Sequence, residues 1–268
     1  MTATFWCATS RDAVRVTGQD AVSYLQSQLS QDLDPLAVGA SAWSLLLQPN
    51  GRLDALLRVR RTGDEELVVD VDRGWGEAVL ARLQRFRIRV AAELEPAELG
   101  VVAVRGEGLA LPPGAEPAWW GPECGFDLLE AEAGPPAGVA AGDAAALEAA
   151  RVAAGWPAIG REITEQTIPA ELGPLLDLAV SFTKGCYPGQ ELVERMNSRG
   201  ASAPRTVRRL AAEGGSLSIG DVVTDEGREV GTVTSAAGGA ALAVVNRAVE
   251  PGAQVSVAGT PARVLPLH

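Results

Sequence analysis

Alternating apolar and polar positions in the first third of the chain predict strands joined by helices. Residues 43–48, 52–61 and 66–72 are β-leaning runs, and the segments PNG (49–51) and GD (63–64) between them are typical of hairpin turns. Residues 14–16 also read as extended. Residues 21–33 have apolar side chains at helical spacing behind Asp20, a possible cap, and residues 74–86 resemble a second helix. We therefore expect an α+β lobe here.

A second round of the same kind starts near Leu99. Residues 100–104 are apolar and predict a strand, whereas residues 144–154 are rich in alanine and predict a helix. The clusters PPG (112–114) and GPP (134–136) fit surface loops. These patterns indicate a second α+β lobe packed closely on the first.

The pattern changes after Pro204 to short strand runs separated by glycine turns. The runs are residues 207–211, 221–224, 231–234, 240–245 and 254–257. Short strands at this spacing without a helix favour a small antiparallel sheet or barrel that closes its own edges. We expect units at 1–93, 94–203 and 204–268, with the last boundary near residues 200–206.

Composition and charge narrow the class of protein. The 268 residues are 47% hydrophobic and 21% charged, which is typical of a globular protein. A net charge of −11 argues against a protein whose main task is to bind nucleic acid phosphates, so we expect no nucleic acid partner. We expect the arginines within 58–61 and 85–89 to lie on strand edges facing water. No targeting segment or apolar membrane span is evident, which predicts a cytoplasmic protein with no membrane partner.

Cysteine and histidine usage excludes several kinds of site. Cys7, Cys124 and Cys186 are widely spaced, so neither a disulfide framework nor a Cys-x-x-Cys metal site is expected. The single histidine, His268, is the last residue, which argues against a serine triad, a Cys–His dyad and a histidine-rich zinc site. A working cysteine would have to act without an imidazole.

The segment KGCYPGQE at residues 184–191 has the strongest local signal for a site. Pro188 and Gly189 suit a type II turn, and residues 190–196 suit a helix, so Cys186 would lie just before a helix N-terminus. In an extended stretch Lys184 and Cys186 share one face, so the ammonium would favour the thiolate. Cys186 could equally be a small buried apolar residue beside a tight turn. The residues alone leave both interpretations open.

This segment resembles the KGCYxGQE signature of the YgfZ family, folate-binding relatives of the glycine-cleavage T-protein that serve iron–sulfur cluster maintenance. RVAAG (151–155), GREI (160–163) and IPAE (168–171) also resemble the T-protein patterns RLEAG, Gly-x-Asp/Glu-Ile and Thr-Pro-x-Glu. The resemblance implies an α+β protein with a T-protein-like three-lobed ring: two α+β lobes and a small C-terminal antiparallel β-barrel. Folate would occupy the central opening, with the cysteine segment near its mouth.

The resemblance also implies folate contacts. Glu171 matches a glutamate that contacts the pterin, and a carboxylate can accept paired hydrogen bonds from an aminopyrimidine edge. Arg205 matches an arginine near the folate. Without the resemblance, Glu171 could be an ordinary carboxylate at a helix start and Arg205 a solvated charge. Asp54 retains one member of an aspartate pair that T-protein uses near the reacting nitrogen, and Ala55 replaces the other.

We therefore predict a tetrahydrofolate-binding accessory protein that supports iron–sulfur cluster assembly or repair through a single cysteine. Its cofactor would be tetrahydrofolate or a folate derivative, and its partners iron–sulfur proteins or assembly factors. A tetrahydrofolate-dependent aminomethyl or methyl transferase and a pure interaction module are the alternatives. The missing aspartate, and Ala153 where T-protein has glutamate, argue against the transferase. The predicted working residues are Cys186 and Lys184, supported by Gly185, Tyr187, Gly189, Gln190 and Glu191.

Overall fold

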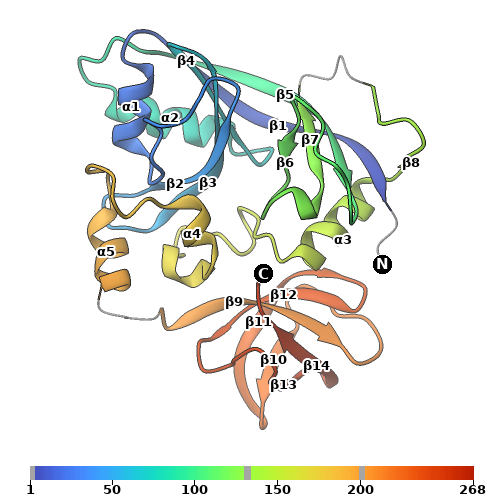
Figure 1. The fold of residues 1–268 in the computed structure, drawn as a ribbon. Coiled ribbons are helices and arrows are strands. Elements are labelled where there is room, and N and C mark those ends of the chain that lie inside the picture. The colour runs from blue at the N-terminus through green and yellow to red at the C-terminus, as the bar shows by residue number, and fades with distance from the viewer. Residues whose placement is uncertain (1–3, 130–133, 199–202) are drawn as a thin grey trace.

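The computed structural model describes residues 4–129, 134–198 and 203–268, and a large sheet forms most of its upper part (Figure 1). The strand order is β2-β3-β4-β1-β5-β7-β6, with β8 beside β1. The strands are β1 (Phe5–Thr17), β2 (Ser41–Leu47), β3 (Leu53–Gly63), β4 (Glu66–Val71), β5 (Glu93–Arg105), β6 (Glu116–Pro117), β7 (Phe126–Leu129) and β8 (Ala140–Ala141). The four strand runs expected before residue 73 are all present.

Strands β1 and β5 join the two predicted lobes. They pair antiparallel along their full lengths, from Phe5 opposite Arg105 to Thr17 opposite Glu93. Strand β4 pairs with β1 on one side of this ribbon, and β7 pairs with β5 on the other. Both α+β regions are therefore built on one continuous sheet.

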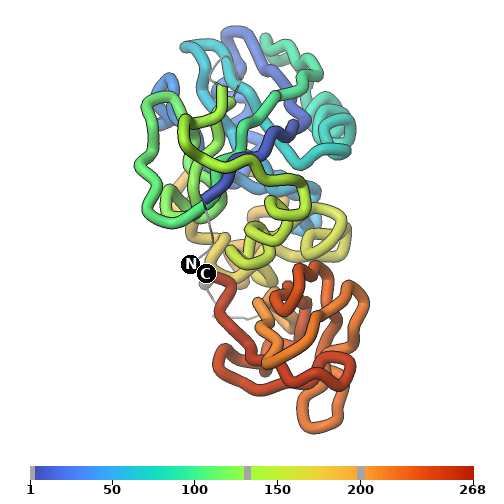
Figure 2. The backbone as a smooth tube through the Cα atoms, turned by 90° about the vertical axis from the view of Figure 1, so that its right-hand side faces the viewer, coloured from blue at the N-terminus to red at the C-terminus, as the bar shows by residue number. Residues whose placement is uncertain are grey.

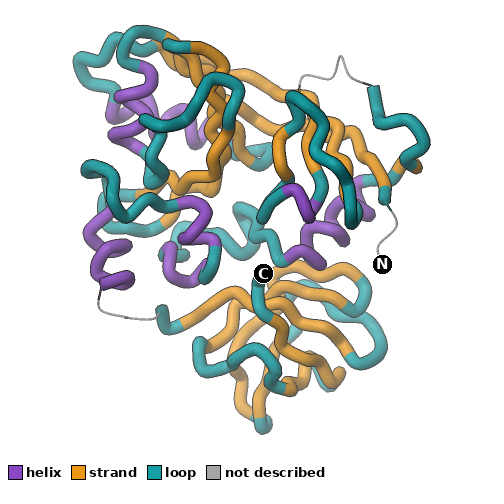
Figure 3. The backbone as a smooth tube through the Cα atoms, in the orientation of Figure 1, coloured by secondary structure: helices purple, strands orange, loops and turns teal. Residues whose placement is uncertain are grey.

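Helices pack on several parts of the sheet (Figure 3). They are α1 (Ala21–Gln28), α2 (Gly76–Phe86), α3 (Ala144–Ala154), α4 (Leu175–Ala179) and α5 (Gln190–Ser198), with the 3-10 turns η1 (Pro122–Cys124) and η2 (Pro169–Leu172). Helix α1 contacts β4, α2 contacts β1 and β5, and α4 contacts β2. Helix α1 is shorter than predicted because Leu29 is extended and pairs with Leu46 of β2.

The C-terminal unit is a closed antiparallel barrel, as predicted. Its strand order is β10-β11-β12-β9-β14-β13, and Figure 2 shows it below the sheet. The strands are β9 (Arg205–Ala212), β10 (Val222–Asp225), β11 (Arg228–Ala237), β12 (Ala240–Asn246), β13 (Gln254–Val257) and β14 (Thr260–Leu265). The sequence pattern missed β14. Helix α3 packs on β11 and β12, so it connects the barrel to the sheet.

Residues after α3 return to the first part of the sheet. Ser30 Oγ donates to the carbonyl of Ala179 at 2.7 Å, and Ser181 N donates to the carbonyl of Ser30 at 2.9 Å. The KGCYPGQE segment therefore packs against residues of the range 1–93, although it belongs to the range 94–203. Of the boundary expected near 200–206, residues 200–202 lie outside the described residues.

The prediction that the first arginine cluster faces water is wrong for Arg58. Its side chain is 1% exposed because it points into the interior, where it pairs with Asp70 and Asp127. The second cluster is not on a strand, because Arg85 belongs to α2 and Arg87 follows it, although both side chains are exposed. Within the described ranges, no helix is long and apolar enough to cross a bilayer.

Candidate functional site

Cys186 lies on an exposed loop between α4 and α5. Of the three cysteines, Cys7 is buried, Cys124 is intermediate and Cys186 is exposed. The alternative that Cys186 fills the core is therefore wrong. That its thiol reacts stays a prediction.

The turn that follows Cys186 has the predicted geometry. Gly189 has a φ of +82°, and the amide of Gln190 donates to the carbonyl of Tyr187 at 3.4 Å, as in a type II turn. A Cβ atom on Gly189 would lie 2.5 Å from the carbonyl oxygen of Gln48. Glycine is thus required here by both its φ and the close approach of the β2–β3 hairpin, whose Gly51 contacts the same turn.

Among the other motif residues, Tyr187 and Gln190 hold the same loop in place. The side chain of Gln190 accepts a hydrogen bond from the amide of Tyr187 at 3.0 Å, and the Tyr187 ring is buried in the main core. Gly185 has open space around it, and Glu191 is exposed in the first turn of α5. Tyr187 and Gln190 therefore fix the chain directly after the exposed cysteine.

Lys184 reaches away from the loop to the C-terminal end of α1. Its Nζ donates to the carbonyls of Gln26 at 2.7 Å, Leu29 at 2.7 Å and Gln31 at 2.8 Å, and to Oε1 of Gln26 at 3.2 Å. Burial lowers the pKa of Lys184 to about 8, although Asp32 and Asp34 act in the opposite direction. The predicted assistance of Lys184 to the thiol stays a prediction.

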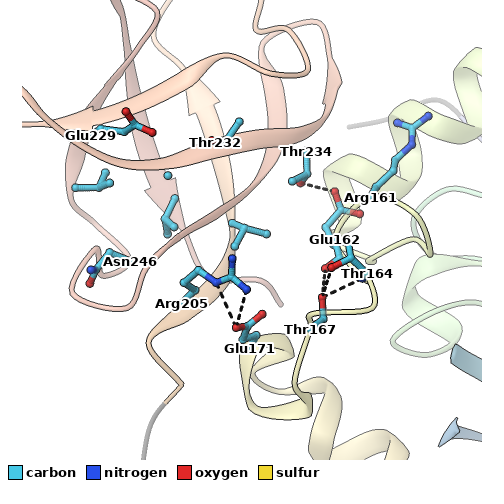
Figure 4. Close-up of a pocket in the computed structure, with 14 residues that line it drawn as sticks. Arg161, Glu162, Thr164, Thr167, Glu171, Arg205, Glu229, Thr232, Thr234 and Asn246 are labelled. Atoms are coloured by element: carbon cyan, nitrogen blue, oxygen red, sulfur yellow. Dashed lines mark hydrogen bonds and ion pairs between the residues drawn. The ribbon is translucent and has the colours of Figure 1, made fainter. Parts of the chain in front are cut away.

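Glu171 and Arg205 lie together at an open cavity of about 520 Å³ between the barrel and the loop before η2 (Figure 4). Nε and Nη2 of Arg205 donate to Oε1 of Glu171 at 3.3 and 3.2 Å. Glu171 is 4% exposed, and burial raises the pKa of its carboxyl while Arg205 opposes that rise. The structure thus brings two of the three predicted folate contacts into one pair.

Asp54 lies in a different cavity, of about 180 Å³, beside α2. Nε of Arg82 donates to its carboxylate at 3.0 Å, and Nη2 of Arg82 donates to the carbonyl of Leu47 at 2.8 Å. Thr164 lines both this cavity and the one beside Glu171. Although the two cavities share Thr164, Asp54 lines only the smaller one. The structure therefore places this predicted contact apart from the Glu171–Arg205 pair.

The patterns in the sequence missed a third cavity, of about 310 Å³, between β1, β5 and α3. Its walls include Trp43, Trp119 and Trp156, and the rings of Trp43 and Trp156 are 4.6 Å apart. Trp119 has a φ of +44°, a strained conformation that is concentrated at functional sites. We call this space the tryptophan cavity. Its tryptophans come from distant segments, so no local motif marks it.

Buried charges line the tryptophan cavity. Asp127 accepts from Arg58 at 3.1 Å and from Arg105 at 2.8 Å. Burial alone would raise the pKa of Asp127, but Arg105 and Arg58 outweigh it and hold the pKa below its usual value. Nη2 of Arg11 and Nε of Arg105 are buried and have no hydrogen-bond partner among the described residues. Both nitrogens are thus unsatisfied donors beside the cavity, which is costly in a buried position.

The RVAAG and GREI motifs connect α3 to the barrel. Nη1 of Arg151 lies 3.2 Å from Oε2 of Glu162, and Nη2 of Arg151 donates to the hydroxyl of Ser235 on β11 at 2.7 Å. Thr234 donates to Oε1 of Glu162 at 2.6 Å. Arg151 lines the tryptophan cavity and Glu162 lines the Glu171 cavity, so one buried ion pair separates the two.

Comparisons with known proteins agree with this architecture. Residues 205–267 match the family model of the CAF17 C-terminal β-barrel domain. The chain is 26% identical to a tRNA-modifying protein YgfZ of Cronobacter sakazakii, covering 74% of this chain and 68% of that protein. It is 28% identical to an aminomethyltransferase of Thermus thermophilus, covering 94% of this chain and 82% of that protein.

A solved structure gives the same result for the fold. The glycine cleavage system aminomethyltransferase T from Bartonella henselae superposes with a TM-score of 0.80 at 18% identity, covering 99% of this chain and 86% of that one. The resemblance to YgfZ proteins and T-protein that the motifs indicated is therefore confirmed, and so is the T-protein-like α+β fold with its C-terminal barrel.

Proposed function

We propose that this chain is a tetrahydrofolate-binding accessory protein of the cytoplasm that supports iron–sulfur cluster assembly or repair. The observation that carries the proposal is the exposure of Cys186 on a loop fixed at Tyr187 and Gly189, outside the described lining of the tryptophan, Glu171 and Asp54 cavities. A thiol placed in this way can meet a partner protein while a ligand occupies the interior. Similarity to YgfZ proteins and to aminomethyltransferases supports a folate-related ligand.

The tryptophan cavity suits the pterin ring of a folate best. A pterin is flat and carries donors and acceptors on its edge, so it can stack on an indole and pair with buried polar groups. Trp43 and Trp119 line this cavity, where the guanidinium of Arg105 stacks over the Trp119 ring, and Arg11 and Arg105 each keep one buried nitrogen without a partner among the described residues. Among its described lining residues, the Glu171 cavity has no aromatic side chain. Glu171 and Arg205 stay predicted contacts, which the same experiment tests.

The transferase alternative is weaker. Asp54, the surviving member of the aspartate pair, accepts a hydrogen bond from Nε of Arg82 at 3.0 Å, and Ala55 has no carboxylate. A carboxylate held by a guanidinium is a poor acceptor for the proton that aminomethyl transfer has to move. We expect no turnover of aminomethyl or methyl donors with tetrahydrofolate, and measurable turnover would favour the transferase.

The partner of Cys186 is proposed to be a protein. Iron–sulfur clusters usually take four cysteine ligands, so a single thiol needs ligands from a partner or a small thiol. Although the YgfZ relatives are named for tRNA modification, a net charge of −11 disfavours direct gripping of tRNA. We therefore propose an iron–sulfur protein or assembly factor as the partner, including enzymes that modify tRNA with a cluster.

Calorimetric titration with 5-formyltetrahydrofolate, a stable derivative, tests the folate assignment. We expect the wild type to bind, Trp119→Ala to bind at least about tenfold more weakly because a stacking surface is lost, and Trp6→Phe, outside the cavity, to bind normally. Glu171→Ala is titrated in parallel. Loss of affinity in Glu171→Ala with normal binding in Trp119→Ala would place the folate in the Glu171 cavity. Absence of binding by the wild type would contradict the folate assignment and favour an interaction module.

A further inference from the structure

The C-terminal end of helix α1 has few local groups to satisfy its last carbonyls, because only the amide of Leu29, which donates to the carbonyl of Leu25 at 3.0 Å, does so from the cap. Its C-cap, Leu29, is extended, and its last turn carries no basic residue. The final carbonyls of a helix need donors, and its C-terminus attracts a cation through the helix dipole. Lys184, which is 155 residues beyond Leu29 in sequence, supplies both.

The oxygens around Lys184 form a nearly closed set. Three backbone carbonyls, of Gln26, Leu29 and Gln31, lie within 2.8 Å of Nζ, and Oε1 of Gln26 is at 3.2 Å. An ammonium has three N–H groups, and three close carbonyls occupy them. The charge of Lys184 therefore serves the end of α1.

The chain on either side of Lys184 is fixed as well. Before it, the amide of Ser181 and the carbonyl of Ala179 bond to Ser30 at 2.9 and 2.7 Å. After it, the buried ring of Tyr187 lies 5.5 Å from Nζ. Only Gly185 and Cys186, both exposed, lie between Lys184 and Tyr187.

We propose that Lys184 is a positioning residue for Cys186: its ammonium fastens the cysteine loop to the C-terminal end of α1 and thereby fixes where the thiol is presented. The role depends on the shape of the cation as well as on its charge. A compact ammonium donates toward three converging carbonyls, whereas the planar fork of a guanidinium does not match them. An arginine at this position keeps the positive charge and loses the attachment.

This proposal differs measurably from activation of the thiol by charge. If Lys184 fixes the loop, Lys184→Met and Lys184→Arg both accelerate hydrogen exchange of the Tyr187 amide, which is bonded to Gln190, by about tenfold or more. The pH midpoint of Cys186 alkylation by iodoacetamide stays unchanged in both variants. If Lys184 activates the thiol, Lys184→Met raises that midpoint and Lys184→Arg restores it. Lys184→Gln, which keeps two N–H donors without charge, replaces Lys184→Met should the latter fail to fold.

Two controls separate a local effect from general destabilisation. Arg195→Met removes an exposed cation from α5 and should leave exchange of the Tyr187 amide unchanged. Alkylation of Cys7 and Cys124 should also stay at wild-type rates in the Lys184 variants, because those cysteines lie elsewhere in the fold. Wild-type exchange in Lys184→Met, or a raised midpoint that Lys184→Arg restores, would overturn the proposal.

The consequence for cells rests on the proposed function of Cys186. If Cys186 serves a cluster enzyme, both Lys184→Met and Lys184→Arg should lower the activity of that enzyme. Exchange and alkylation report on the loop itself. Failure of folate binding, or of any effect of Cys186 on cluster enzymes, would therefore contradict the proposed function and leave the positioning role standing.

Discussion

The cysteine loop and the tryptophan cavity are built in opposite ways. The loop is a short continuous segment whose exposed thiol lies between two anchors, Lys184 and Tyr187. The cavity draws its walls from β1, β2, β5, β7 and α3, and its charges are buried beneath indole rings. Under the proposed function, the interior would bind the folate and the surface would present the thiol to a partner protein.

The largest expected effect is on the charged base of the tryptophan cavity. Arg58→Met leaves the buried carboxylates of Asp70 and Asp127 short of a partner, which should lower the free energy of unfolding by about 3–5 kcal/mol. Denaturant unfolding followed by tryptophan fluorescence measures this loss.

An exposed ion pair between β1 and β4 of the same sheet provides the matched control. Arg15 pairs with Glu66, and its side chain is 45% exposed. Because water screens such a pair, Arg15→Met should cost no more than about 1 kcal/mol. Equal losses in the two variants would contradict the view that the buried arginine sustains the cavity.

A smaller effect is expected at the base of the cysteine loop. Gly189→Ala forces a side chain into a φ of +82° and against the carbonyl of Gln48, at a cost of about 2 kcal/mol. Gly185→Ala meets no atom within 4 Å, so its cost should be a few tenths of that. Thermal unfolding of the two variants provides the comparison. If Gly185→Ala lowered the stability as much as Gly189→Ala does, the turn at Gly189 would not be what fixes the loop.

The smallest effect concerns the Glu171–Arg205 pair at the cavity beside the barrel. Burial raises the pKa of Glu171 and Arg205 opposes the rise, so Arg205→Met should raise this pKa further. A carboxyl whose folded pKa is raised contributes stability at low pH that is lost as pH rises through the folded pKa. The variant should therefore have a lower free energy of unfolding than the wild type at pH 7. The difference should be under about 1 kcal/mol because the Arg205 side chain is half exposed. At pH 4 the two free energies of unfolding should be nearly equal. Equal deficits at both pH values, by chemical denaturation, would rule out an effect through Glu171.

Local patterns predicted much of the architecture. The hairpin strands, α3 with its limits at Ala144 and Ala154, and the type II turn at Gly189 all follow from interactions between residues close in sequence. The barrel was predicted from strand spacing. Helix α1 was predicted too long because the pairing of Leu29 with Leu46, a contact across the fold, ends it early.

The rest depends on contacts that no local pattern encodes. Arg58 alternates with apolar residues like a surface arginine, and only the positions of Asp70 and Asp127 in the folded sheet make it a core residue. Lys184 was predicted to favour the thiolate of Cys186 because the two residues are close in sequence. In the structure its N–H groups donate to carbonyls at the C-terminal end of α1. The tryptophan cavity was missed for the same reason, since its walls meet only in the fold.

The central claim is that an exposed thiol, and no other cysteine, performs the work of this protein. The direct measurement is the activity of a cluster-containing enzyme in cells that depend on this chain, complemented with wild type, Cys186→Ala or Cys124→Ala at matched protein levels. We predict that Cys186→Ala loses most of the complementation while still binding 5-formyltetrahydrofolate, and that Cys124→Ala, altered at a partly buried thiol, retains it. Full complementation by Cys186→Ala would contradict the account.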